Sequence, residues 1–151
     1  MNVISLRQVS TRTSDPTRKR SAVMRMHLWL ESPDGVLFGL GRLLLLREIK
    51  ASGSLTAAAA NLGMSYRGAW GKIKTTEELL GEKLIERKGC RRSGYRLTSF
   101  GETLSNRFEE WFAAVERFAL KKGNDLLPLQ TRPFTDGNTD ASQCAKYNML
   151  K

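Results

Sequence analysis

Two short helical segments joined by a glycine-containing turn constrain the fold of this chain more than any other feature. The first reads SLTAAAANLG, in which Ser54 is a good N-cap, alanine favours helix, and Gly63 stands where a glycine ends a helix. Ser65 begins a second segment, which Gly81 ends. Two helices joined by a three- or four-residue turn form the helix-turn-helix pattern, whose second helix enters the major groove of DNA. The spacing therefore predicts a DNA-binding motif.

Hydrophobic periodicity predicts a β-hairpin and a helix before this motif. Residues 24–30 alternate apolar with polar side chains, as in a strand with one buried face. Residues 32–35 form a predicted turn, because proline fixes φ and glycine accepts a positive φ, and residues 36–38 return as the second strand. A broad apolar face then indicates a helix over residues 39–51, which Gly53 ends.

A basic hairpin and a long helix are predicted after the motif. Residues 83–87 and 95–97 read as short strands, and the loop between them has a glycine at each shoulder, so it forms a projecting wing. Ser99 and Glu102 have the spacing of a capping box, which begins a helix that Gly123 ends. The predicted fold class is mainly α with small β: a winged helix-turn-helix with an N-terminal β-hairpin and a long C-terminal dimerisation helix.

Length and composition indicate one folded domain between two irregular ends. The 151 residues suffice for one hydrophobic core. Residues 1–22 are rich in Ser, Thr and Arg and are expected to form a flexible basic tail, and residues 121–151 are expected to be a disordered tail. The DNA-binding and dimerisation domain is therefore expected over residues 23–120.

Positive charge is concentrated in two stretches of the sequence. The formal net charge is +10, and residues 1–27 and residues 64–98 each carry an excess of five positive charges. Clustering of this kind is typical of phosphate-binding surfaces, although a basic surface also serves solubility.

Other patterns exclude several classes of function. No segment is apolar enough to span a bilayer, the N-terminus lacks the apolar stretch of a secretory signal, and two distant cysteines make no disulfide framework. The sequence contains no P-loop, no HExxH, no CxxC and no plausible catalytic triad. We expect a cytoplasmic protein that is not an enzyme and that uses no metal and no cofactor.

The second helix of the motif has two different faces. At 100° per residue, one face is apolar and is expected to pack on the other helices: Tyr66, Ala69, Trp70, Ile73 and Leu80. The opposite face is polar or small: Arg67, Gly68, Gly71, Lys74 and Thr75. Glycine inside a helix costs about 1 kcal/mol relative to alanine, so two glycines here favour a backbone that approaches DNA closely. A solvated face that tolerates glycine is the alternative.

Side-chain chemistry assigns the expected DNA contacts. Arg67 is the candidate for base recognition, because a guanidinium group can bind O6 and N7 of guanine. Hydroxyl and ammonium groups suit phosphates, and the arginines at the wing tip suit the backbone or the minor groove. The predicted DNA-binding residues are Ser54, Thr56, Ser65, Tyr66, Arg67, Gly68, Lys72, Lys74, Thr75, Arg87, Lys88, Arg91, Arg92 and Arg96.

The long helix carries an apolar stripe that one small domain would leave partly in water. Its members recur at spacings of three and four, which places them on one side of the helix. We expect a homodimer formed through Leu104, Phe108, Trp111, Phe112, Val115 and Phe118.

The segments GSLTAAAANLGMSYRGAW (residues 53–70) and LIERKGCRRSGYRLTSFGE (residues 84–102) carry a family resemblance. They are similar to the N-terminal domain of ModE-type molybdate-responsive transcription regulators and, more distantly, to LysR-type DNA-binding heads. The resemblance covers about half of the chain and implies a winged helix-turn-helix that dimerises through its last long helix. In that family molybdate-binding β-barrel domains follow. Because the residues after Gly123 show no run of alternating strands, we expect no molybdate binding.

Three functions fit these patterns. The leading interpretation is a dimeric, sequence-specific transcription regulator that binds double-stranded DNA. A protein-interaction module that uses the same winged surface is the second, and a non-specific architectural DNA binder is the third.

Overall fold

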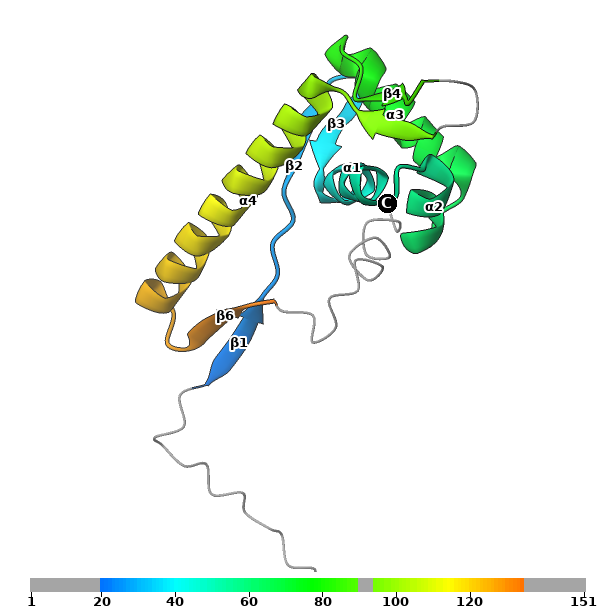
Figure 1. Ribbon diagram of the computed structural model, residues 1–151. Coiled ribbons are helices and arrows are strands. Elements are labelled where there is room, and N and C mark those ends of the chain that lie inside the picture. The colour runs from blue at the N-terminus through cyan, green and yellow to red at the C-terminus, as the bar shows by residue number, and fades with distance from the viewer. Residues whose placement is uncertain (1–19, 90–93, 135–151) are drawn as a thin grey trace, which may run out of the picture.

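The computed structural model describes residues 20–89 and 94–134, whose arrangement is shown in Figure 1. Helices α1, α2 and α3 gather beside a small hairpin, and the long helix α4 extends away from this group. The elements in chain order are β1 (Ser21–Met24), β2 (Trp29–Ser32), β3 (Gly35–Gly39), α1 (Leu40–Ser52), α2 (Leu55–Asn61), α3 (Tyr66–Leu80), β4 (Ile85–Arg87), β5 (Tyr95–Leu97), α4 (Ser99–Leu126) and β6 (Gln130–Pro133).

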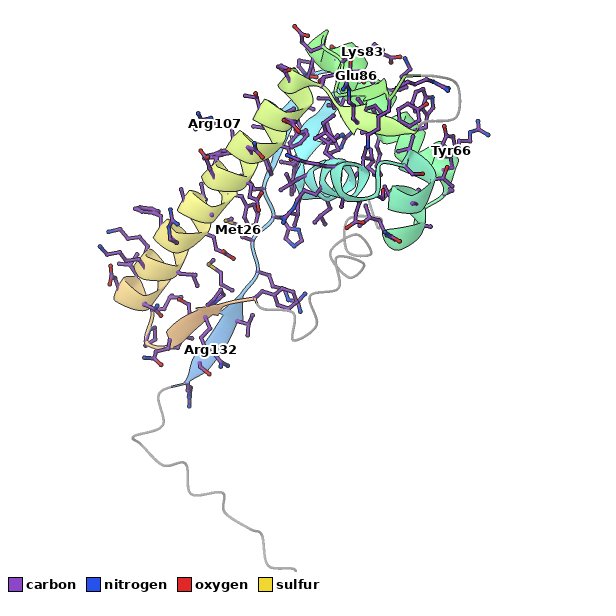
Figure 2. The ribbon with its side chains drawn as sticks, viewed as in Figure 1. Met26, Tyr66, Lys83, Glu86, Arg107 and Arg132 are labelled. Atoms are coloured by element: carbon purple, nitrogen blue, oxygen red, sulfur yellow. The ribbon has the colours of Figure 1, made fainter. Side chains whose placement is uncertain are left out.

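The hairpin before α1 is confirmed, but its first strand is shorter than predicted. Strand β2 pairs antiparallel with β3 around the expected turn. Residues 25–28, among which Figure 2 marks Met26, belong to no strand, so the predicted strand over residues 24–30 is wrong there. Met26 and Leu28 are nevertheless less exposed than Arg25 and His27. The alternation therefore reflects one covered face of an extended segment rather than strand pairing.

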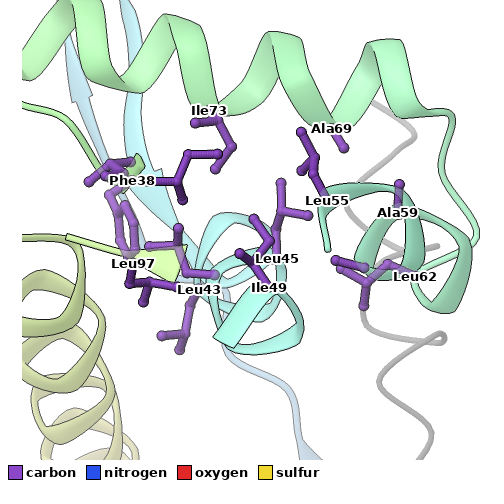
Figure 3. Close-up of a cluster of buried hydrophobic side chains, with 14 of the residues drawn as sticks. Phe38, Leu43, Leu45, Ile49, Leu55, Ala59, Leu62, Ala69, Ile73 and Leu97 are labelled. Carbon is purple, nitrogen blue, oxygen red and sulfur yellow. The ribbon is translucent and has the colours of Figure 1, made fainter. Parts of the chain in front are cut away.

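One hydrophobic cluster joins α1, α2, α3, β3 and the hairpin β4–β5 (Figure 3). Leu45 and Ile49 of α1 are fully buried, and Ile73 faces them from α3, on the side that the periodicity of α3 predicted. Phe38 of β3 packs edge-on against Phe108 of α4, with 5.0 Å between the ring centroids. This aromatic contact attaches α4 to the cluster.

The predicted helix ends of α1, α2 and α3 are confirmed. Gly53 and Gly81 adopt the left-handed conformation directly after α1 and α3, with φ of 68° and 71°. Gly63 does the same after α2, with φ of 65°. Ser54 and Ser65 cap α2 and α3, and each hydroxyl accepts a hydrogen bond from the backbone N–H three residues later. Local sequence signals thus define this part of the fold.

The N-cap of α4 lies one residue before the predicted capping residue. Its N-cap is Thr98, whose Oγ1 accepts a hydrogen bond from the backbone N–H of Gly101 at 3.0 Å, so the expectation that Ser99 caps the helix is wrong. The same hydroxyl donates to the carbonyl oxygen of Lys83 at 2.5 Å. Thr98 takes the capping position because its hydroxyl also joins α4 to the segment before β4.

Gly101 allows the first turn of α4 to approach that segment closely. A Cβ atom at this position would overlap the carbonyl oxygen of Leu84. We expect Gly101→Ala to lower the free energy of unfolding by about 1–3 kcal/mol, which is the usual cost of over-packing a well-packed site. Urea denaturation measures this change. Gly71→Ala is the matched control, because a Cβ there would meet no atom within 4 Å. Equal stability of the two variants would contradict this account.

Helix α4 passes the predicted end at Gly123 and continues to Leu126. The chain then turns back, and β6 pairs in parallel with β1. The backbone N–H of Thr131 donates to Asn124 Oδ1 at 2.6 Å, and its hydroxyl donates to the carbonyl oxygen of Leu120 at 3.1 Å. The expected lack of regular structure after Gly123 is therefore wrong for β6. The predicted N-terminal tail is likewise wrong for residues 21–22, which belong to β1. Residues 1–19 and 135–151 of the two predicted tails lie outside the described ranges.

Candidate nucleic-acid interface

The outer face of α3 is open to solvent. Of the expected polar face, Arg67, Gly68, Gly71 and Thr75 are exposed, whereas Lys74 is half-buried. Tyr66 departs from the expectation, because it was placed on the packed side and is 46% exposed. It occupies the first position of α3, beyond the edge of the core (Figure 2). The exposed face of α3 is therefore larger than the sequence predicted.

The two glycines on this face differ in what they do for the fold. A Cβ atom on Gly71 would meet nothing within 4 Å, so packing does not require glycine there. A Cβ on Gly68 would lie 3.1 Å from the Ser65 hydroxyl, which caps the helix. Gly71 lowers the helix propensity of α3, although an alanine side chain there would clash with nothing. A glycine at this place favours close approach of the helix backbone to a binding partner.

Hydroxyl groups stand at the starts of α2 and α3. Ser54 and Ser65 accept hydrogen bonds from backbone N–H groups at 3.2 and 3.0 Å, respectively. Each hydroxyl keeps its own proton, which can be donated to a phosphate oxygen. Thr56 is exposed in the first turn of α2. The positive end of the α3 dipole adds to the attraction for an anion at Ser65.

The predicted wing is confirmed as a hairpin in which β4 pairs antiparallel with β5. The backbone N–H of Tyr95 donates to the carbonyl oxygen of Gly53 at 2.8 Å, so the base of the wing is attached to the junction of α1 and α2. The predicted tip contacts, Arg91 and Arg92, lie outside the described residues. Their role stays a prediction.

The basic side chains at the base of the wing have different partners. The Nε of Arg96 donates to Glu86 Oε1 at 2.7 Å across the two strands. The guanidinium of Arg87 lies over the ring of Tyr95, 5.5 Å from its centroid. Lys88 is exposed. Because Glu86 already compensates its charge, Arg96 is the weakest of these predicted DNA contacts.

Aromatic side chains connect α3 with the wing. The ring centroids of Trp70 and Tyr95 are 6.0 Å apart, and the ammonium of Lys74 lies 5.7 Å from the Trp70 ring. Partial burial and the neighbouring Tyr95 hydroxyl raise the pKa of Tyr66 above its ordinary value. The Tyr66 phenol therefore stays protonated at neutral pH and can donate a hydrogen bond to a phosphate.

A buried carboxylate that the sequence analysis did not single out holds the start of the wing on α3. Glu77 is 6% exposed, and its Oε1 accepts from the backbone N–H groups of Leu84 at 2.9 Å and Ile85 at 3.3 Å. Its Oε2 accepts from Lys83 Nζ at 3.0 Å, and this bond raises the pKa of Lys83. The signal was present, because Glu77 falls on the apolar face of α3, where a carboxylate must be hydrogen-bonded.

A second group that the analysis missed joins α1 to α3. Arg42 Nε donates to Thr76 Oγ1 at 2.6 Å, and this buried hydroxyl donates to the carbonyl oxygen of Lys72 at 3.0 Å. Burial lowers the pKa of Arg42, and burial together with the charge of Arg42 lowers that of Lys72. Among the described residues, neither cation forms an ion pair. The sequence signal was Arg42 itself, a cation in the first turn of an apolar helix.

Neither membrane insertion nor a metal cluster is indicated by the part of the chain that the structure describes. None of its helices is both long and apolar enough to cross a bilayer. Within the same ranges, no three His, Cys, Asp or Glu side chains gather as a group that could hold a metal ion.

Comparison with known families agrees with the arrangement of α1, α2, α3 and the wing. Residues 40–102 match the model of the lysR family of bacterial regulatory helix-turn-helix proteins. Over these residues the chain is similar to the helix-turn-helix domains of that family. A crystal structure of a CbnR DBD–DNA complex shares the fold of this segment, with a TM-score of 0.50 and 20% sequence identity, and the match covers 60% of this chain and 100% of that one.

The predicted resemblance to ModE-type regulators is confirmed over part of the length of those proteins. The transcriptional regulator ModE of Yersinia pestis is 33% identical over 93 residues, which are 60% of this chain and 35% of that protein. The DNA-binding transcriptional dual regulator ModE of Escherichia coli strain K12 is 32% identical over 94 residues, which are 60% of this chain and 36% of that protein. The matched part thus spans about a third of the length of these relatives.

Most of α4 lies beyond the residues that match the lysR family model, and this helix carries the predicted dimerisation stripe. Trp111 is 41% exposed and Phe118 is 63% exposed, whereas Phe108 belongs to the core beside Phe38. The other members are half-buried: Leu104, Phe112 and Val115. The structure therefore brings two large aromatic side chains of the stripe to the surface.

Proposed function

We propose that this chain is a sequence-specific, DNA-binding transcription regulator that works as a homodimer. The observation that carries the proposal is the exposed outer face of α3, which presents Arg67 beside the capping hydroxyl of Ser65 within a LysR-type domain. The ModE relatives are named as transcriptional regulators, which supports the same function here.

The proposed contacts divide by chemistry. Arg67 reads a base, since its guanidinium can donate two parallel hydrogen bonds to guanine in the major groove. Gly68, Gly71 and Thr75 allow α3 to enter that groove closely. The hydroxyl, phenol and basic groups around α3 and the wing contact the DNA backbone: Ser54, Thr56, Ser65, Tyr66, Lys72, Lys74, Arg87, Lys88, Arg91, Arg92 and Arg96.

Selection of bound fragments from a pool of random duplexes tests the proposal. The full chain should enrich one short palindromic sequence and protect it from nuclease cleavage at physiological salt. Two other outcomes would overturn the proposal. Absence of protection would point to a protein-interaction module, and uniform coverage of all duplexes would point to an architectural DNA binder.

Removal of the Arg67 guanidinium should separate base recognition from backbone binding. We expect Arg67→Ala to weaken binding to the selected duplex by about 1–3 kcal/mol, because a two-donor contact with a base is lost. Binding to random DNA should change little. Lys74→Ala is the comparison, and it should weaken binding to both duplexes and lower the salt dependence. Fluorescence anisotropy titrations would refute this assignment if the two variants behaved alike.

The proposal assigns the chain no catalytic step, no metal and no resident cofactor. Bacterial chromosomal DNA lies in the cytoplasm, so a DNA-binding role implies a cytoplasmic location. The named contacts include no molybdate site, and regulation by molybdate forms no part of the proposal.

A further inference from the structure

We propose that Arg42 and Lys72 together bind one phosphate group of the DNA backbone, on the flank of α3 that faces away from the wing. This inference rests on the proposed function, because it adds a backbone contact to the same interface. Arg42 belongs to α1, outside the two helices and the wing on which the predicted contacts lie.

The position of Lys72 around α3 separates it from the wing. Lys74 lies beside Trp70, which contacts the wing residue Tyr95. Two residues further back, Lys72 is turned by roughly 160° around the helix axis from Lys74. The ammonium groups of these two lysines therefore leave α3 on opposite flanks.

The guanidinium of Arg42 is held beside this second flank. Its Nε donates to the fully buried hydroxyl of Thr76, which in turn donates to the carbonyl oxygen of Lys72. This chain of two hydrogen bonds fixes the Arg42 guanidinium relative to the backbone of α3 at Lys72. The terminal nitrogens of Arg42 find no acceptor within the described residues. They remain available for the two parallel hydrogen bonds that a guanidinium makes to a phosphate.

The local charge balance favours an anion at this place. The ion pairs found within residues 20–89 and 94–134 use other cations, so neither Arg42 nor Lys72 has a carboxylate partner there. Helix α1 also begins here with no side-chain cap and no acidic residue in its first turn, and its dipole adds positive potential. Burial and mutual repulsion lower the pKa of Lys72, and a bound phosphate would compensate both charges.

The geometry of DNA gives this pair a role that the wing cannot fill. The major groove is about 12 Å wide, and a helix within it has one phosphate strand on each side. Lys74 and the wing lie toward one strand, whereas Arg42 and Lys72 lie toward the other. Contacts on both strands would fix the rotation of α3 in the groove and hence the direction in which Arg67 points.

The salt dependence of DNA binding tests the inference. Arg42→Met, Lys72→Met and the double variant should be titrated against the selected duplex at several KCl concentrations. Each lost phosphate contact lowers the slope of log K against log salt by about 0.9. Because both side chains bind the same phosphate, we expect about that decrease from the double variant and a smaller decrease from each single variant. Arg42→Lys, which keeps the charge, should restore most of the slope.

The matched control is Arg47→Met on the same helix. Arg47 is exposed and pairs with Glu109 at 3.0 Å, so its removal should leave the slope unchanged. If Arg42 only supported the fold, the melting temperature of Arg42→Met would fall while the slope stayed at the wild-type value. That pattern would overturn the inference.

Inorganic phosphate distinguishes a backbone contact from a site for a free anion. Millimolar phosphate should leave the wild-type melting temperature unchanged. Phosphate could instead raise the melting temperature of the wild type but not that of the double variant, while the salt slope of DNA binding is the same in both. That result would assign the pair to a free anion and refute the proposed contact. Failure of the proposed function would give a different result from failure of this inference, because the wild-type chain would then select no duplex at all.

Discussion

Replacement of Trp111 and Phe118 with aspartate should leave the protein monomeric and weaken its binding to a duplex with two half-sites by about 10²–10⁴-fold. Both rings are substantially exposed on α4, and burial of an aromatic side chain contributes roughly 1.5–3 kcal/mol. A two-fold dimer covers these rings in both copies, and it turns the second half-site contact into an intramolecular one. Sedimentation velocity and a titration with the selected duplex measure the two effects.

The control for this variant carries the same added charge elsewhere on α4. Thr103 and Asn106 are exposed and lie on other sides of the helix, so Thr103→Asp with Asn106→Asp should remain dimeric. Because Trp111 also contacts Phe108, the single change Phe118→Asp provides a second test at the more exposed ring. A wild-type chain that sediments as a monomer at tens of micromolar, on the order of the range for weak dimers, would rule out the dimer model.

Glu77→Ala should lower the free energy of unfolding by about 2–4 kcal/mol. The buried carboxylate accepts hydrogen bonds from the backbone N–H groups of Leu84 and Ile85, and both hydrogen bonds would be lost. Urea denaturation followed by circular dichroism measures the loss. Glu77→Gln keeps one carbonyl acceptor, so its loss of stability should be smaller.

Glu78→Ala is the matched control for this second prediction. Glu78 is the next residue of α3 and is exposed, so its removal should change stability by less than about 0.5 kcal/mol. The anchoring role of Glu77 would be untenable if both alanine variants unfolded at the same urea concentration. DNA binding offers a second readout, because loosening of the wing should weaken binding to selected and random duplexes together.

The helix-turn-helix could be predicted because its signals are local. Ser54 and Ser65 cap their own helices, and Gly63 and Gly81 adopt the left-handed conformation within two residues of the helix ends. Each signal acts within about one helical turn, so the sequence contains both partners of the interaction. The same reasoning located the apolar face of α3, which packs as predicted at Ile73.

The missed features depend on pairs of residues that are distant in sequence. Strands β1 and β6 pair from opposite ends of the described residues, and no turn signal connects them. Thr98 rather than Ser99 caps α4, because its hydroxyl also donates a hydrogen bond to the carbonyl oxygen of Lys83. Arg42 was passed over because its hydrogen-bond partner, Thr76, belongs to another helix. The candidate interface was therefore predicted on α3 and missed on α1.

The length of α4 means that a small change in the crossing angle of the two helices in the proposed dimer would produce a large displacement at their ends. The 28 residues of this helix span roughly 42 Å, so a crossing near its centre leaves an arm of about 20 Å on each side. A change of about 10° in the crossing angle would move the end of such an arm by roughly 4 Å, close to the 3.4 Å rise of one base pair. Repacking of the exposed rings at the crossing would thus alter the half-site spacing that two α3 helices can span.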